Sequence, residues 1–354
     1  MKRFLKTTNL FVIIVMTAML ALSACSSKNE GNVSGGSDEP QGTSSGTGGG
    51  QTYVLKLGHI APDEHSYTKG VEQFAKAVEE ASGGRLKIEL YGGGQLGGGE
   101  REVTEQVQLG ALDMTLVTAG PVGNFVEKFS VLEMPFLFRD LDHVYKTLDG
   151  EVGQELAKLL DEAGFVTLGF WENGFRHLTS NKRPIKSPED AKGMKFRTVE
   201  NPLYVATYKA IGGDPTPIAF PETYTSLHQG VVDGMDQSYG VMASTKMYEV
   251  QEYLSEVGIY YAAAPLLMNK SKFESLPQDL QQILKEKGQE YAVIQRQINQ
   301  DMEGQQKKDM IALGLKVVER QDVDLEGFKR AVQSVYDEFG PKFGDLLDKI
   351  QAVQ

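Results

Sequence analysis

Residues 53–90 read YVLKLGHIAPDEHSYTKGVEQFAKAVEEASGGRLKIEL, and their pattern decides the fold class. The first six residues alternate apolar and polar, as a half-buried strand does. From Val71 to Val78 the apolar residues recur at helical spacing, and Ser-Gly-Gly at 82–84 ends that helix. Alternation resumes at Leu86. The stretch therefore predicts one strand–helix–strand unit with a parallel crossover.

The same alternation of helices and strands continues outward from this unit and predicts an α/β fold. We expect helices at 99–109, 141–163 and 203–211, strands at 113–117, 165–171 and 194–198, a long helix at 278–312, a short strand at 315–318 and terminal helices at 325–352. Roughly 300 residues follow residue 52, enough for two lobes or one large domain.

A weak internal repeat relates Leu109–Met114 (LGALDM) to Gln229–Gly234 (QGVVDG). Each follows an amphipathic helix and leads toward a strand. Two lobes built on the same corner would explain the likeness. Glycine and aspartate are also common at such corners, which is an equally good explanation.

The N-terminus has the outline of a signal peptide over residues 1–24. Lys2, Arg3 and Lys6 precede an apolar run at 10–22. That run is shorter than the roughly 20 apolar residues of a membrane span. No later stretch approaches that length, so we expect no transmembrane segment.

The chain's single cysteine, Cys25, directly follows Leu22-Ser23-Ala24 and resembles the acylated cysteine of a bacterial lipobox. One cysteine cannot form an internal disulfide, so attachment to lipid is the better interpretation. Residues 26–52 are mostly Ser, Gly, Thr, Asn and Gln, and 25–52 is predicted to be a lipidated flexible tether. A disordered leader of another purpose is the alternative. The expected location is the extracytoplasmic face of the cell membrane.

Charge limits the possible partners. The chain has 36 basic and 48 acidic residues, and removal of residues 1–24 leaves 33 basic residues and a net charge of −15. Such a surface repels nucleic acid, so no nucleic-acid partner is expected. Any anionic ligand must be held by locally placed cations.

Motifs for catalysis or metal binding are not found after residue 52. That part of the chain has no Gly-x-Ser-x-Gly elbow, no phosphate-binding Gly-x-x-x-x-Gly-Lys-Ser/Thr and no His-Glu-x-x-His. The glycine-rich stretch 92–99 lacks dinucleotide-binding spacing and predicts a loop or helix entry. The residues thus give little indication of catalysis, and we predict neither a cofactor nor a metal at the site.

Residues 171–202, WENGFRHLTSNKRPIKSPEDAKGMKFRTVENP, carry a resemblance together with Tyr224-x-x-Leu-x-x-Gly-x-x-Asp-Gly and Pro135-Phe-Leu-Phe. In order and spacing these motifs resemble the TRAP-transporter solute-binding family over essentially residues 53–340. The resemblance implies a two-lobed, periplasmic-binding-protein-like α/β fold with a ligand cleft between the lobes and long C-terminal helices. It places lobe I at about 53–172 plus a returning segment, lobe II at about 173–265 and the C-terminal helices at about 276–354.

The resemblance also implies a function without catalysis: a monomer captures a small organic acid, closes about a hinge and delivers the acid to integral-membrane TRAP permease subunits. Arg197 ends a predicted strand, where open α/β sheets bind ligands, and a guanidinium matches the two oxygens of a carboxylate. By resemblance Arg197 is the main carboxylate clamp and Arg176 the second basic contact. A surface arginine at a strand end is the alternative.

Other positions are weaker candidates for ligand contacts. Gln237 stands where the family usually has asparagine, and Asp236 beside it could accept from hydroxyls or merely start a helix. His65 could donate to a hydroxyl or a second carboxylate, or only cap a helix. Glu100 follows the glycine-rich loop, Thr118 ends a predicted strand, and Asn173 belongs to the stretch before Arg176. Phe220 could supply an aromatic face to the ligand or could equally belong to the core.

Trp171-Glu-Asn-Gly before Arg176 is similar to family members that take sugar acids such as hexuronates or diketogulonate. Similar members take C4-dicarboxylates. The many partners for hydroxyls favour a sugar acid. A sensory surface lipoprotein and an extracellular enzyme on acidic sugars are the alternatives from other classes.

Overall fold

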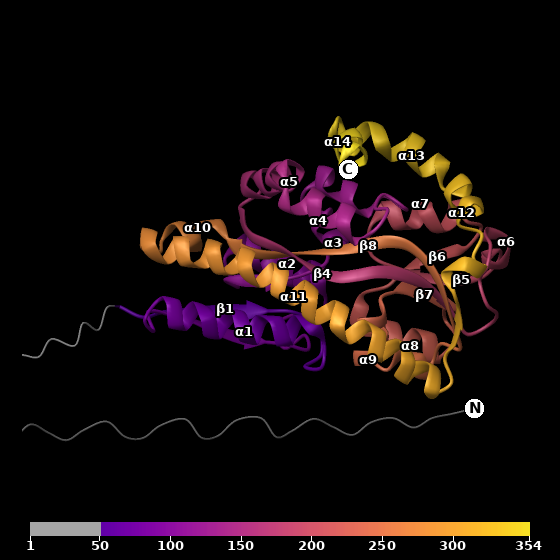
Figure 1. Cartoon of the computed structure of the whole chain (residues 1–354), viewed down its shortest axis with the longest axis horizontal. Helices are drawn as coiled ribbons and strands as arrows, with labels where there is room; N and C mark the ends of the chain where they lie inside the picture. Colours follow the sequence, from indigo (N-terminus) through magenta and orange to yellow (C-terminus); the bar gives the residue numbers. More distant parts are fainter. Residues whose placement is uncertain (1–50) are drawn as a thin grey trace, which may run out of the picture. The chain divides into compact units, whose positions relative to one another are not determined.

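The computed structural model describes residues 51–354 (Figure 1). The predicted signal peptide, Cys25 and nearly all of the predicted tether lie outside the described residues. β1 (Tyr53–Gly58), α1 (Ser66–Ala81) and β2 (Leu86–Tyr91) form the predicted unit, and β1 pairs in parallel with β2. The apolar side of α1 is buried, as its spacing predicts.

We use first lobe for the part of the fold that continues from this unit. Its further elements are α2 (Glu100–Leu109), β3 (Met114–Leu116), α3 (Ala119–Val122), a 3-10 helix (Glu127–Glu133), α4 (Leu141–Asp149), α5 (Glu151–Glu162) and α10 (Lys270–Glu274). The second lobe consists of α6 (Pro188–Ala191), β5 (Lys195–Thr198), α7 (Pro202–Ala210), β6 (Asp214–Pro217), α8 (Thr223–His228), β7 (Gly234–Gln237) and α9 (Tyr239–Ser244).

Two long antiparallel strands, β4 (Phe165–Ser180) and β8 (Tyr253–Asn269), join the lobes. They lie at the centre of one nine-stranded sheet with the order β2-β1-β3-β8-β4-β7-β5-β6, in which β9 (Lys316–Val318) also pairs with β8. Sequence patterns predicted only residues 165–171 of β4 and did not predict β8. Both strands are buried along almost their whole length, so they lack the alternation that marks a half-buried strand.

The repeated corners are structurally equivalent. Gly110 and Gly230 have φ angles of 77° and 69°, which favour glycine. Asp113 accepts a hydrogen bond from the amide of Lys56 in β1 at 2.8 Å, and Asp233 accepts one from Lys195 in β5 at 2.9 Å. Each lobe thus fixes its strand through an equivalent aspartate. This equivalence supports a repeated structural corner over a coincidence of common corner residues.

The C-terminal helices connect both lobes (Figure 1). α11 (Gln278–Ala312) has the predicted bounds and packs against α1 in the first lobe and α9 in the second. α12 (Leu325–Ala331) and α13 (Gln333–Phe339) pack on the second lobe, and α14 (Leu346–Ala352) packs on α5 of the first. Within residues 51–354, no helix carries an apolar stretch long enough for a membrane span.

Candidate ligand-binding cleft

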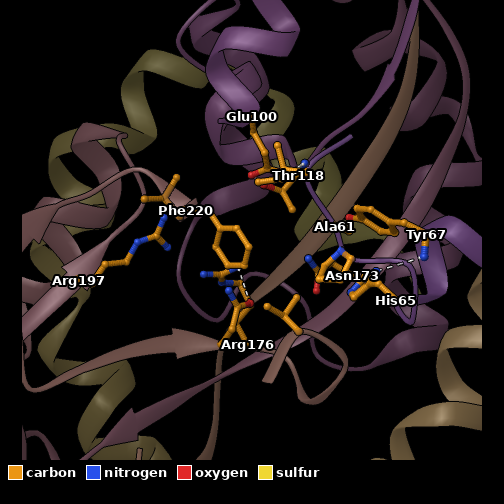
Figure 2. Close-up of a pocket in the computed structure, with 14 residues that line it drawn as sticks. Ala61, His65, Tyr67, Glu100, Thr118, Asn173, Arg176, Arg197 and Phe220 are labelled. Carbon is orange, nitrogen blue, oxygen red and sulfur yellow. Dashed lines mark hydrogen bonds between the residues drawn. The ribbon is translucent and has the colours of Figure 1, made fainter. Parts of the chain in front are cut away.

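A cavity lies between the lobes and is lined by both of them and by β4 (Figure 2). Eight of the nine predicted contact residues line it: His65, Glu100, Thr118, Asn173, Arg176, Arg197, Phe220 and Gln237. Asp236 does not. The other lining residues were not predicted: Ile60, Ala61, Pro62, Tyr67, Val199 and Val241.

Arg197, in β5, is a buried cation with few partners. Its side chain donates from Nε to the carbonyl of Ile218 at 2.9 Å, and Phe220 lies beside the guanidinium. Within the described residues, the four N–H groups on its two terminal nitrogens have no protein acceptor. Burial, and next the positive charge of Arg176, lower the Arg197 pKa to about 10, so the guanidinium stays charged at neutral pH. Among the described residues, this cation of the cavity lining forms no ion pair.

Arg176, in β4, is held differently. Its Nε pairs with the carboxylate of Asp236, Nη2 donates to the Asp236 carbonyl at 2.8 Å, and Nη1 donates to Gln237 at 3.1 Å. Burial alone would lower the Arg176 pKa, but Asp236 outweighs it and raises the pKa. Three of its five N–H groups are used, and the other two have no acceptor in the part of the chain that the structure describes.

Asp236 departs from its predicted role as an acceptor for ligand hydroxyls. One carboxylate oxygen pairs with Arg176, and the other accepts from the Tyr208 hydroxyl at 2.7 Å. Consecutive residues of a strand point to opposite faces, so Gln237 of β7 reaches the cavity and Asp236 does not. The position of Asp236 supports a role in holding Arg176.

His65 caps α1, as the alternative interpretation expected, and also lines the cavity. Its Nδ1 accepts from the amide of Tyr67 at 3.2 Å, so the proton of the neutral ring lies on Nε2. Burial, and next the nearby rings and charges of His59 and Lys69, lower the His65 pKa to about 3. His65 is therefore neutral at pH 7. In the described part of the chain, neither its Nε2 nor the buried Tyr67 hydroxyl has a hydrogen-bond partner.

Two amides also present donors. The oxygen of Asn173 accepts from the Ser238 hydroxyl, and the oxygen of Gln237 accepts from Arg176 and the Ser238 amide. Since their oxygens are occupied, both side chains offer NH₂ groups. Gln237 thus still supplies an amide where asparagine is usual.

Glu100 is the one carboxylate among the residues that line this cavity. Its two oxygens accept from the amide and the hydroxyl of Thr118, both at 2.7 Å. Trp171, the first residue of the Trp-Glu-Asn-Gly signature, is fully buried against Phe74. Tyr67 could not have been distinguished from its neighbours by sequence, because it lies at the start of a helix whose buried face it shares.

Figure 2 shows how these groups are distributed. Arg197 approaches from one side, and His65, Tyr67 and Asn173 lie across the cavity from it. One side therefore carries positive charge, and the opposite side carries neutral donors. Within residues 51–354, no three His, Cys, Asp or Glu side chains come close enough together to hold a metal ion.

A buried acid near the cleft should make stability depend on pH. Glu133 accepts a hydrogen bond from the Tyr204 hydroxyl at 2.5 Å, while its other oxygen has no partner among the described residues. Burial raises its pKa to about 7, against the lowering effects of Tyr204 and Arg176. A glutamate in the unfolded chain titrates near pH 4.3. The stabilisation of the protonated acid is therefore complete below about pH 4 and is lost as pH rises through 7.

We expect Glu133→Gln to reduce the fall in unfolding free energy between pH 5 and 8 by up to roughly 3 kcal/mol. Urea unfolding at the two pH values measures it. Glu303, whose pKa is raised to about 7 by burial and then by Glu172, accounts for a remaining fall. An unchanged pH dependence in the variant would contradict the assignment to Glu133.

Similar proteins agree with this architecture. A "solute-binding protein" of Verminephrobacter eiseniae is 40% identical over 285 residues, which are 80% of this chain and 84% of that protein. The structure of a TRAP periplasmic solute binding protein from Polaromonas sp. JS666 bound to D-erythronate superposes with a TM-score of 0.83 and 39% identity, covering 86% of this chain and 99% of that one.

A TRAP periplasmic solute binding protein from Roseobacter denitrificans with bound β-D-glucuronate gives a TM-score of 0.82 and 30% identity, over 85% of this chain and 100% of that one. Residues 57–342 match the family model itself. The predicted family and the two-lobed α/β fold are thereby confirmed. The chain belongs to the bacterial extracellular solute-binding proteins, family 7.

Proposed function

We propose that this solute-binding protein serves a TRAP-type transporter and that its ligand is a sugar acid, a hydroxylated acid with a single carboxylate. The observation that carries the proposal is Arg197, a buried residue of the cavity lining whose four terminal N–H groups have no acceptor among residues 51–354. A ligand carboxylate supplies the missing charge and a planar pair of acceptors. The two free N–H groups of Arg176 extend the same subsite.

The lining beyond the two arginines favours hydroxyls over a second carboxylate. His65 is held neutral, Tyr67 is uncharged, and Glu100 is acidic. A second carboxylate would meet no cation there and would be repelled by Glu100, whereas hydroxyl oxygens can accept from His65 and Tyr67. This distribution of charge disfavours the C4-dicarboxylate alternative.

The ligands of the two similar structures described above belong to this class. D-erythronate and β-D-glucuronate, bound to the Polaromonas and Roseobacter proteins, each combine one carboxylate with several hydroxyls. Glu100, the one acid of the lining, is occupied by Thr118 and has no second carboxyl beside it to form an acid–base pair. Binding without catalysis therefore accounts for the site better than turnover.

In the proposed mechanism the acid docks on Arg197 and the first lobe then closes over it. Closure excludes water and strengthens the ion pair. The closed monomer delivers the acid to the permease subunits. Lipid at Cys25 and the tether of residues 25–52 would hold the protein at the extracytoplasmic face of the membrane. The proposed lobe boundaries near 172 and 265 fall inside β4 and β8.

A ligand panel tests the proposal. We expect aldonates, uronates and keto sugar acids to raise the melting temperature of the purified protein, and at least one of them to bind tenfold or more tightly than succinate or malate. Calorimetry supplies the Kd values, and the corresponding neutral sugars serve as controls. Tighter binding of a dicarboxylate than of every sugar acid would contradict the proposed ligand class.

Glu100→Gln provides a matched variant. Glutamine retains an oxygen for the Thr118 amide but removes the negative charge. Succinate should then gain affinity by roughly fivefold relative to a sugar acid, since the repulsion of its second carboxylate is relieved. An unchanged ratio of the two Kd values would show that Glu100 does not discriminate.

A further inference from the structure

Beyond the cavity the lobes meet along a second, polar contact. We call it the α3–α7 seam and define it by Gly120, Asn124, Ser130 and Glu133 of the first lobe and Glu200, Asn201 and Tyr204 of the second. None of these residues lines the cavity. Whatever the seam contributes to binding, it does not touch the ligand.

Asn201 has two roles in the seam. Its oxygen accepts from the amide of Leu203 at 2.9 Å and caps the N-terminus of α7. Its NH₂ group donates across the lobes, to the carbonyl of Gly120 at 2.9 Å and to the hydroxyl of Ser130 at 3.3 Å. The side chain is only 4% exposed, so these bonds are shielded from water.

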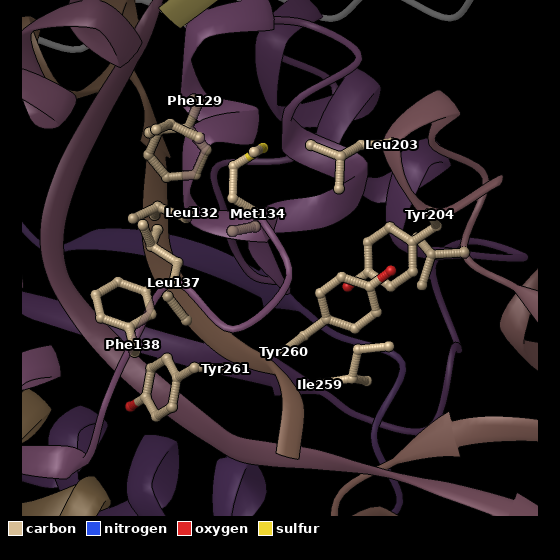
Figure 3. Packing of buried hydrophobic residues seen from close by; sticks show 14 of the residues in the cluster. Phe129, Leu132, Met134, Leu137, Phe138, Leu203, Tyr204, Ile259, Tyr260 and Tyr261 are labelled. Carbon is tan, nitrogen blue, oxygen red and sulfur yellow. The ribbon is translucent and has the colours of Figure 1, made fainter. Parts of the chain in front are cut away.

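Two further hydrogen bonds cross the seam. Asn124 donates to the carbonyl of Glu200 at 2.9 Å, and the Tyr204 hydroxyl donates to Glu133. The Tyr204 ring packs on Tyr260 of β8, with ring centroids 4.3 Å apart (Figure 3). Hydrogen bonds across the seam and packing on β8 therefore both hold Tyr204 in place.

Glycine allows the backbones to approach this closely. A Cβ on Gly120 would lie 3.3 Å from the Tyr204 ring and from Val199, and one on Gly123 would lie 3.1 Å from the Asn201 amide nitrogen. A Cβ at either position would crowd the second lobe by a few tenths of an ångström, and one on Gly123 would first clash with the Ser130 hydroxyl of its own lobe, 1.9 Å away. The first lobe thus presents bare backbone to the residue that caps α7.

The seam is continuous with the cavity wall. Thr118 lines the cavity and Gly120 follows two residues later, while Val199 lines it from the second lobe and Asn201 follows two residues later. The same two segments therefore enclose the ligand and form the seam. Separation of the lobes at one place requires separation at the other.

We propose that Asn201 is a positioning residue for ligand capture, an inference that rests on the proposed function. Its amide joins the lobes in the arrangement that encloses the ligand and thereby sets the affinity without contacting the ligand. A ligand that binds the closed arrangement gains affinity in proportion to the population of that arrangement. Loss of the Asn201 bridge should reduce that population and weaken binding.

Asn201→Asp tests the proposal with almost no change in shape. Aspartate caps a helix as well as asparagine does, so α7 keeps its cap. The donor, however, becomes an oxygen facing the Gly120 carbonyl. We expect the Kd of the sugar acid that binds the wild type most tightly to rise roughly 10- to 100-fold, with Arg197 and Arg176 intact. Asn201→Ser, which keeps a cap without the repulsion, should show a smaller increase.

Asn269→Asp is the matched control. Asn269 caps α10 through its oxygen and donates its NH₂ group to the carbonyl of Val107 at 2.8 Å, but all of these groups belong to the first lobe. The same chemical change there should lower the melting temperature of the unliganded protein and leave Kd unchanged. Asn201→Asp should instead raise the Kd and leave the melting temperature of the unliganded protein nearly unchanged. Small-angle scattering should also give it a larger radius of gyration than wild type without ligand.

The two proposals fail separately. A wild-type protein that no acid in the panel stabilises contradicts the proposed function; the scattering of the unliganded proteins then decides the role of Asn201, and equal radii overturn it. If the wild type binds a sugar acid and Asn201→Asp binds it equally tightly, the seam proposal alone is overturned. The seam proposal is also overturned if Asn201→Asp behaves as the control Asn269→Asp should, with a lower melting temperature and an unchanged Kd.

Discussion

Arg197→Ala is expected to abolish nearly all ligand-induced stabilisation while leaving the unliganded protein at least as stable as wild type. Arg197 is 4% exposed and its guanidinium has no anionic partner within the described residues, so the empty protein bears the cost of desolvating this cation. A ligand carboxylate removes that cost. Loss of such a buried, hydrogen-bonded pair should weaken binding by about 3–5 kcal/mol, or roughly two to four orders of magnitude in Kd.

Melting curves with and without a saturating sugar acid measure this effect, and calorimetry gives the Kd. Arg197→Lys is the control, since lysine keeps the charge but loses the planar pair of donors and should bind with intermediate affinity. Normal stabilisation of Arg197→Ala by the acid would refute the assignment of this residue as the carboxylate clamp.

Asp236→Ala should have the opposite signature: a large loss of stability with the carboxylate clamp preserved. Asp236 and Arg176 form an ion pair whose side chains are 1% and 4% exposed, and Tyr208 donates to the same carboxylate. Removal of the aspartate leaves a buried, uncompensated cation and an unpaired hydroxyl. The expected cost is about 3–5 kcal/mol of unfolding free energy, measured by urea denaturation.

The control for this prediction is Glu252→Ala, which breaks an exposed ion pair with Lys316. Screening by water should limit its cost to a small fraction of the loss expected for Asp236→Ala. Since Arg197 is untouched in Asp236→Ala, the sugar acid should still raise the melting temperature of that variant. A loss no larger than that of the exposed pair would contradict the role of Asp236 as the counter-ion of Arg176.

Local patterns predicted the elements that have one buried face. The unit of β1, α1 and β2 and the bounds of α11 follow from amphipathic spacing, which a single sequence shows directly. The two central strands do not follow from it, because a strand buried on both faces has no polar side to produce a period. The residues that join the lobes were therefore the hardest to predict.

The site could be predicted as a set of residues but not as a set of roles. Resemblance brought eight lining residues together, yet only the geometry shows that Arg176 forms an ion pair and that Arg197 forms none with the described residues. The alternation of β7 separates Gln237 from Asp236, and a shift of one residue in the expected strand would have exchanged them. Hydrogen-bond partners distant in the chain, such as Tyr208 for Asp236, leave no signal in the sequence.

The course of β4 and β8 has a consequence for how the chain acquires its structure during synthesis. Phe165, at the start of β4, pairs with Asn269 at the end of β8, and β3 of the first lobe has β8 as its inner neighbour. A chain that emerges from its N-terminus cannot complete the first lobe until the whole second lobe has been made. The central sheet of both lobes should consequently form in one late step. Most of the chain should have been synthesised before any stable native-like intermediate exists.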